Sequence, residues 1–164
     1  MVDHQVAIER ITADFKRWQE LLDLIHVSFA YMQGVVDPPS SAFALDENAL
    51  REKALSEIAF VALAKGELVG CMFCREENDA LYVGKLAISP SCQGKGIGTR
   101  LLEMAMDLAR EHNLPALELQ TRIELVANHA YFESRGFVRS GEGAHAGYDR
   151  PTWIWMRKRL EARN

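Results

Sequence analysis

Hydrophobic residues recur along the chain with two spacings, one typical of helices and one typical of strands. Apolar positions three and four residues apart predict helices near residues 13–30, 46–56, 96–112 and 125–134. Asp46 is a good N-cap residue and precedes the second of these segments. The pattern therefore predicts about four helices, spread over the whole chain.

Short apolar runs between the helices predict about seven strands. They cover residues 6–12, 58–63, 68–73, 80–88, 116–120, 137–140 and 152–156. The order is one strand, two helices, three strands, a helix, a strand, a helix and two strands, which predicts a mixed α/β fold with helices packed on a sheet. No repeat or linker divides the chain, so we expect a single domain over residues 1–164.

Composition and charge exclude several classes of protein. A chain of 164 residues with 48% hydrophobic residues can bury a core. A net charge of −4 argues against a general nucleic-acid binder. No apolar run approaches the roughly 20 residues that span a bilayer, and residues 1–5 lack the features of a secretory signal. We therefore expect a cytoplasmic protein with neither a nucleic-acid nor a membrane partner.

Two of the three cysteines have the spacing of a metal or redox pair. Cys71 and Cys74 lie three apart in a predicted strand, so their sulfur atoms point to opposite faces. The third, Cys92, does not complete a second pair. We interpret Cys71 and Cys74 as small core residues and expect no metal site.

A glycine-rich turn between the strand at 80–88 and the helix near 96–112 carries the most informative chemistry. Gly94, Gly96 and Gly98 allow free backbone amides to converge, and the helix dipole adds positive potential. Such a turn suits phosphate. The spacing fits neither a Walker loop nor the G-x-G-x-x-G dinucleotide fingerprint, which disfavours a nucleotide hydrolase. A turn without a ligand is the remaining alternative.

The segment Gln93-Gly94-Lys95-Gly96-Ile97-Gly98 also fits the pattern Gln/Arg-x-x-Gly-x-Gly/Ala. Together with Leu86–Pro90 before it and Tyr131–Phe137 after it, this segment resembles the GNAT superfamily of acetyl-CoA-dependent N-acetyltransferases. The resemblance covers residues 58 to 158. It implies a mixed, mostly antiparallel central sheet of about seven strands flanked by about four helices.

The resemblance implies that acetyl-CoA is the cosubstrate and that no metal takes part. The pyrophosphate would lie on the amides of residues 93–99, the pantetheine arm would pair with residues 86–88, and the strand at 117–119 would splay away. The backbone N–H of Ile88 would stabilise the oxyanion. The implied cofactor-binding residues are Leu86, Ala87, Ile88, Gln93, Gly94, Lys95, Gly96, Ile97, Gly98, Thr99, Asn128 and Phe132.

The chain departs from the family pattern at its catalytic acid. Many members have a Tyr four residues before the Gly of Gly-Phe, where this chain has Phe132. We take the neighbouring Tyr131 as the candidate acid, although a packed core aromatic is the alternative. We take His145 as the candidate base, against the alternative of a mobile polar loop, and Glu118 could act through a water.

The implied reaction is direct attack by a primary amine on the acetyl group. The amine could belong to a small molecule, a protein or a peptide, and the acidic balance mildly favours a cationic acceptor. The resemblance places the acceptor near Tyr31, Met32 and residues 37–41. A CoA-binding module or sensor without catalysis is the alternative that Phe132 motivates. A homodimer is common in the family, but no interface is readable in the sequence.

Overall fold

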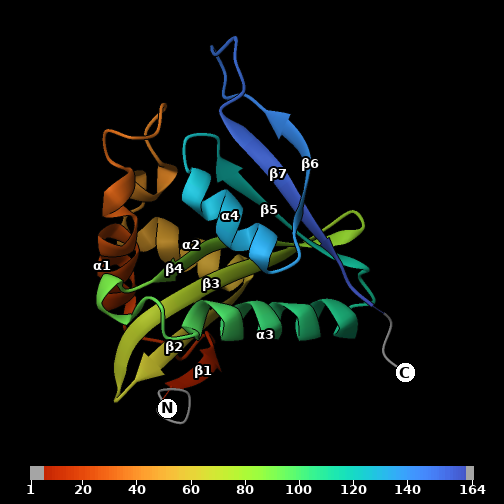
Figure 1. Cartoon of the computed structure of the whole chain (residues 1–164). Helices are drawn as coiled ribbons and strands as arrows, with labels where there is room; N and C mark the ends of the chain where they lie inside the picture. The colour runs from red at the N-terminus through yellow and green to blue at the C-terminus, as the bar shows by residue number, and fades with distance from the viewer. Residues whose placement is uncertain (1–5, 162–164) are drawn as a thin grey trace.

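One sheet organises the computed structural model, which describes residues 6–161 (Figure 1). Its strands are β1 (Val6–Arg10), β2 (Ile58–Ala64), β3 (Glu67–Glu77), β4 (Ala80–Ile88), β5 (Ala116–Arg122), β6 (Val138–Gly143) and β7 (Trp153–Arg159). The helices are α1 (Trp18–Phe29), α2 (Glu47–Ser56), α3 (Ile97–Glu111) and α4 (Val126–Ser134), with short 3-10 turns η2 (Ala30–Met32), η3 (Ser41–Ala44) and η4 (Pro90–Cys92).

The seven strands have the order β1-β2-β3-β4-β5-β7-β6. Every neighbouring pair is antiparallel except β4 and β5, which are parallel. A parallel pair needs a crossover, and α3 supplies it. The mixed, mostly antiparallel sheet with flanking helices confirms the predicted fold class.

Several element boundaries differ from the prediction, including the ends of β5, β6 and β7, which extend to Arg122, Gly143 and Arg159. Helix α1 begins at Trp18 rather than near residue 13, and β1 ends at Arg10 rather than residue 12. Strand β3 continues through the polar residues 75–77, because these pair with β4 in a hairpin. Cross-strand pairing, which a hydrophobic pattern does not register, keeps polar residues in strand geometry.

Two hydrophobic clusters cover the two faces of the sheet. Trp18, Leu21 and Ile25 of α1 pack with Leu50 of α2 against one face of the sheet. Leu101, Leu102 and Ala105 of α3 pack against the other, and Figure 1 shows this helix crossing in front of the strands. The core therefore lies on both sides of the sheet. Fully burying each such side chain stabilises the fold by roughly 1.5–3 kcal/mol.

Strand β3 shows how one segment serves both clusters. Cys71 and Phe73 belong to the cluster under α1, and Met72 and Cys74 belong to the cluster under α3. The expected divergence of the two sulfur atoms is confirmed. Burial raises the pKa of both thiols to about 12, so both are inert small core residues.

Helix α4 is a cover rather than a core helix. None of its residues is buried, but Leu125 before it and Phe137 after it are. Gly136, directly after the C-cap Arg135, has a φ of +94°, the left-handed conformation in which glycine commonly ends a helix. One face of α4 is therefore free to line a cavity.

Candidate active site

The glycine-rich loop between β4 and α3 is built for backbone chemistry. Gly94 has a φ of +79° and Gly96, the N-cap of α3, has a φ of +84°, a region that other residues rarely adopt. Nothing lies within 4 Å of the position that a Cβ on Gly94 would take. The loop therefore exposes its main chain on the side that a ligand approaches.

The amides of this loop are free to bind an anion. Over residues 6–161, no backbone N–H of residues 93–99 donates to another group of the protein. The first intrahelical bond runs from the Arg100 amide to the Gly96 carbonyl at 3.1 Å. The unpaired amides and the N-terminal end of the α3 dipole together create positive potential. These features fit a phosphate group, as the glycines predict, and are compatible with the diphosphate that the resemblance implies.

Strands β4 and β5 separate soon after they meet. They pair only at Leu81 with Leu117 and at Tyr82 with Glu118. Beyond these pairs a cavity of about 1200 Å³ lies between the strands, and residues of α1, β4, β5, α4 and the loop line it. The predicted splay between these two strands is confirmed.

The backbone of Ile88 faces this cavity. The Ser89 amide donates to the Val69 carbonyl of β3 at 2.8 Å. Because successive residues of a strand present their backbone groups to opposite sides, the N–H and C=O of Ile88 point away from β3. The Gln93 side chain accordingly donates to the Ile88 carbonyl at 3.3 Å. The N–H is the group expected to stabilise an oxyanion.

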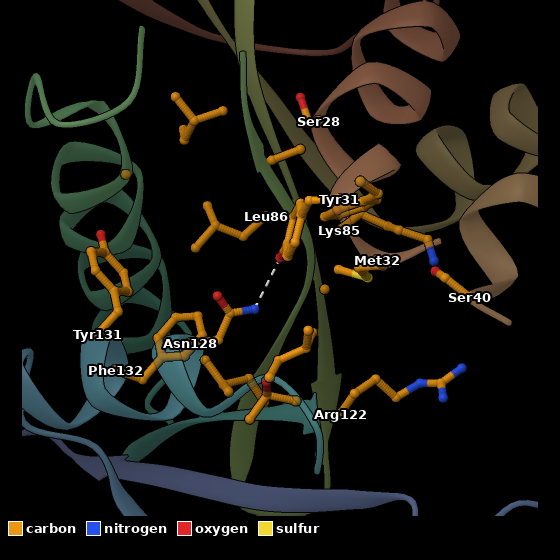
Figure 2. Close-up of a pocket in the computed structure, with 18 of the residues that line it drawn as sticks. Ser28, Tyr31, Met32, Ser40, Lys85, Leu86, Arg122, Asn128, Tyr131 and Phe132 are labelled. Atoms are coloured by element: carbon orange, nitrogen blue, oxygen red, sulfur yellow. Dashed lines mark hydrogen bonds between the residues drawn. The ribbon is translucent and has the colours of Figure 1, made fainter. Parts of the chain in front are cut away.

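A β-bulge lies in the part of β4 that lines the cavity. Lys85 and Leu86 together face Met72, and Lys85 has a φ of +48°. Figure 2 shows Leu86 pointing towards Tyr131 and Phe132, whereas Lys85 points the other way, towards the segment that begins at Ser40. Adjacent side chains of one strand thus serve different ends of the cavity.

Two phenols lie in the cavity at different places. Tyr131 packs edge-on against Phe132 under the Arg135 guanidinium, and its hydroxyl lies 2.8 Å from the position of a Cβ on Gly98. Tyr31 accepts a hydrogen bond from Asn128 Nδ2 at 3.1 Å, which crosses the cavity from α4 (Figure 2). Either hydroxyl retains its own proton for donation.

His145 is held in a fixed position at the cavity wall. Its ring packs edge-on against Trp153, and its Nδ1 lies 2.6 Å from Thr152 Oγ1, which also accepts from the His145 amide. Burial and the nearby Arg122 guanidinium lower the pKa of His145, against a smaller opposing effect of Glu124. The imidazole is therefore neutral near pH 7 and can accept a proton.

The structure separates the predicted site residues into two groups. Lys95 is exposed and does not line the cavity. The other predicted residues line it: Leu86, Ala87, Ile88, Gln93, Gly94, Gly96, Ile97, Gly98, Thr99, Asn128, Tyr131, Phe132 and His145. Glu118 lies outside the lining and pairs with Arg157 at 3.2 Å, and its action through a water stays a prediction.

Lys85, Arg122 and Trp153 line the cavity but were not singled out as site residues in the sequence. Lys85 lies in an apolar strand, where a single lysine is an available signal. Arg122 follows the predicted end of its strand and carries no such signal. Tyr31 and Met32 line the cavity, as the resemblance implies.

Two features are absent from residues 6–161. No helix there is long and apolar enough to cross a membrane. No group of three or more His, Cys, Asp or Glu side chains there is arranged to hold a metal ion.

Comparison with known proteins gives a consistent match. The model of the acetyltransferase (GNAT) family matches residues 18–137. The IAA acetyltransferase of Azospirillum brasilense is 33% identical over 130 residues, which are 77% of this chain and 82% of that protein. N-alpha-acetyltransferase 30 of Schizosaccharomyces pombe is 28% identical over 88 residues, which are 51% of this chain and only 59% of that relative.

A solved structure supports the fold over nearly the whole chain. The PaiA N-acetyltransferase of Thermoplasma acidophilum, solved in complex with coenzyme A, superposes with a TM-score of 0.78 at 14% identity. The match covers 94% of this chain and 99% of that one. At 14% identity this similarity shows that the two proteins share a fold and does not by itself show a shared activity.

Proposed function

Because the chain belongs to the acetyltransferase (GNAT) family, we propose that it transfers an acetyl group from acetyl-CoA to a primary amine. The observation that carries the proposal is the set of unpaired amides at residues 93–99 beside the separated strands β4 and β5. Bound acetyl-CoA would supply an activated acyl group. A cytoplasmic location and a homodimer remain predictions.

The loop amides would hold the pyrophosphate, and the backbone of residues 86–88 would pair with the pantetheine arm. Gln93, Thr99, Asn128 and Phe132 would complete the contacts, since all of them line the cavity. The Ile88 N–H would donate to the acetyl oxygen, where negative charge develops. The protein therefore binds and orients the donor mainly through its main chain.

The acceptor would enter from the side of the cavity where Lys85 and Arg122 lie (Figure 2). His145 would take the proton that the amine loses on attack, because its pKa is lowered and the ring is neutral. Tyr131 would donate a proton to the leaving sulfur, with Tyr31 as the second phenol in reach of the cavity. The relatives include acetyltransferases named for IAA and for protein α-amines, so their names do not select one acceptor.

Calorimetric titration with acetyl-CoA tests the binding site. We expect saturable binding by the wild type and none by Gly98→Glu, because this side chain would project towards the Tyr131 hydroxyl and add negative charge to the phosphate site. Gly141→Glu is a matched control that makes the same substitution in β6, outside the cavity lining, and should weaken binding far less. Equal binding by wild type and Gly98→Glu would falsify the assignment.

A thiol-release assay over a panel of amines tests catalysis. Turnover with any acceptor supports the transferase. Acetyl-CoA binding without turnover on any amine favours the alternative that Phe132 motivates, a protein that binds CoA without catalysis.

A further inference from the structure

The charged side chains that line the cavity are all basic. Its basic side chains are Lys85, Arg122, Arg135 and His145. None of its lining residues, which are drawn from residues 6–161, is Asp or Glu. The cavity is therefore cationic although the chain carries a net charge of −4. A local field of this sign repels a cationic acceptor, against the mild preference that net charge suggested.

Lys85 and Arg122 lie together at the acceptor end. Arg122 Nη2 donates to the Pro39 carbonyl at 3.1 Å, and Lys85 Nζ donates to Ser41 Oγ at 3.1 Å. Figure 2 shows both cations on the side of β4 away from Leu86 and Tyr131. They therefore border the same loop, at the end opposite the loop of residues 93–99.

Neither cation has a carboxylate partner. Over residues 6–161, no Asp or Glu oxygen lies within 4 Å of the Lys85 ammonium or of the Arg122 guanidinium. Burial lowers the pKa of Lys85, and the charges of Lys53 and Arg122 lower it further. Burial also lowers the pKa of Arg122. In both groups the effect of burial on the pKa outweighs the opposing attraction of acidic groups, Glu57 for Lys85 and Glu124 and Asp37 for Arg122.

Two carboxylates, Glu124 and Asp37, act on the Arg122 guanidinium from a distance, and each accepts hydrogen bonds from other groups. Glu124 Oε2 accepts from the Asp37 amide at 3.1 Å. The Asp37 carboxylate accepts from Tyr148 at 2.6 Å and from Arg150 at 3.2 Å. Neither residue lines the cavity, so neither carboxylate occupies the place where an acceptor would meet the two cations.

Several buried donors at this end also lack an acceptor. Arg122 Nη1 and Trp153 Nε1 are buried without a hydrogen-bond partner. The Thr121 hydroxyl also lacks a hydrogen-bond partner, and Thr121 is only 6% exposed. All three residues line the cavity. These atoms are fully buried and not open to a ligand in this conformation, and the buried Glu124 Oε1 is unpaired as well, so the exposed parts of Arg122 and Lys85 are what a ligand can reach.

We propose that the acceptor amine carries a carboxylate group and that Arg122 and Lys85 bind this carboxylate. The inference rests on the proposed acetyl transfer. The planar guanidinium of Arg122 can hold a carboxylate through paired hydrogen bonds, and Lys85 adds a second charge. The same two cations disfavour the ammonium form of the amine, which leaves the neutral nucleophile that attack requires. Polyamines and lysine side chains in basic surroundings are excluded as preferred acceptors.

Matched pairs of acceptors test the inference by activity. L-Leucine and L-phenylalanine are compared with L-leucinamide and L-phenylalaninamide, which keep the side chain and the primary amine and lose only the carboxylate. We expect kcat/KM to favour each acid by about tenfold or more. Arg122→Gln and Lys85→Gln should remove the preference, and Arg139→Gln, an exposed cation outside the lining, should keep it. Equal rates for acids and amides, or faster amides, overturn the inference.

A binding measurement separates this inference from the proposed function. N-Acetyl-L-leucine and N-acetyl-L-leucinamide are titrated into the CoA complex by calorimetry, which requires no turnover. Tighter binding of the acid, lost in Arg122→Gln, supports the carboxylate site even if no acetyl transfer is measured. Equal affinities, or no binding of either compound by a protein that binds CoA, overturn it. Failure to bind acetyl-CoA at all contradicts the proposed function itself.

Discussion

At the scale of single residues, His145 makes the cavity sensitive to pH. Burial lowers its pKa below the ordinary value of 6.5, so the proton-accepting form persists into mildly acidic solution and is lost as the pH falls further. We expect kcat at saturating acceptor to fall along a limb centred below pH 6.5. In His145→Gln, kcat should drop by about a hundredfold or more and this limb should vanish.

The control for His145 is thermal stability across the same pH range. The unfolded chain binds a proton at His145 more readily than the folded one, so wild-type stability should decline below about pH 6.5, and less so in His145→Gln. A kcat profile identical in wild type and variant would rule out His145 as the base.

The two phenols of the cavity give a second prediction. Tyr131→Phe should lower kcat at least tenfold with little change in acetyl-CoA affinity, if its hydroxyl protonates the leaving sulfur. Tyr31→Phe, the matched variant, removes the hydroxyl that Asn128 contacts and should change mainly the KM for the acceptor. Rapid-quench kinetics separates the two effects. The reverse pattern would transfer the acid role to Tyr31.

At the scale of elements, the start of α2 depends on one side chain. Asp46 Oδ1 accepts from the Ala49 amide at 2.8 Å, which confirms the predicted cap. Asp46→Ala should lower the free energy of unfolding by about 1 kcal/mol in urea denaturation. Asp46→Asn keeps a side-chain oxygen in place and should lose little. Equal losses in both variants would mean that the negative charge, not the hydrogen bond, stabilises this end.

The open edge of β4 should respond to the donor. Amides of residues 84–99 include those facing the cavity and the unpaired ones of the loop. Acetyl-CoA should slow their hydrogen exchange, measured by mass spectrometry, while residues 104–111 in the second half of α3 change little. The Gly98→Glu variant is the control, because it should not bind acetyl-CoA and its hydrogen exchange should not change when acetyl-CoA is added. Protection spread evenly over the chain would indicate general stabilisation instead of a local site.

The kind and order of the elements could be predicted because their signals are local. Apolar spacing, Asp46 and Gly136 each report on a few neighbouring residues, and the structure has all four helices and seven strands. The boundaries were less predictable, since residues 75–77 remain in β3 only because β4 pairs with them. The bulge at Lys85 was missed for the same reason, because it depends on the register with Met72.

At the scale of the whole molecule, the two-sided core should decide thiol reactivity. Cys71 and Cys74 are fully buried on opposite faces, and Cys92 is partly exposed in the cavity lining. A disulfide reagent such as DTNB should therefore titrate one thiol in the native protein and three in urea. Cys92→Ser should remove the fast reaction, and CoA should slow it. Fast reaction of two or three native thiols would contradict the burial.

The donor loop was legible in the sequence because it is one continuous segment with a glycine signature. The two cations of the acceptor end were not, because Lys85 and Arg122 come from distant segments and meet only when the sheet forms. Total charge was misleading for the same reason, since the acidic residues lie outside the lining. Long-range assembly therefore sets the limit of what the sequence alone discloses.

The bulge in β4 has a consequence for how such a protein diversifies. Since Lys85 and its neighbour Leu86 point to opposite sides of the strand at this bulge, one substitution can change the acceptor site without altering the donor site. A variant with another residue at position 85 should therefore still bind acetyl-CoA. A lineage built on this strand can therefore explore new acceptors by single steps while the rest of the machinery is inherited intact.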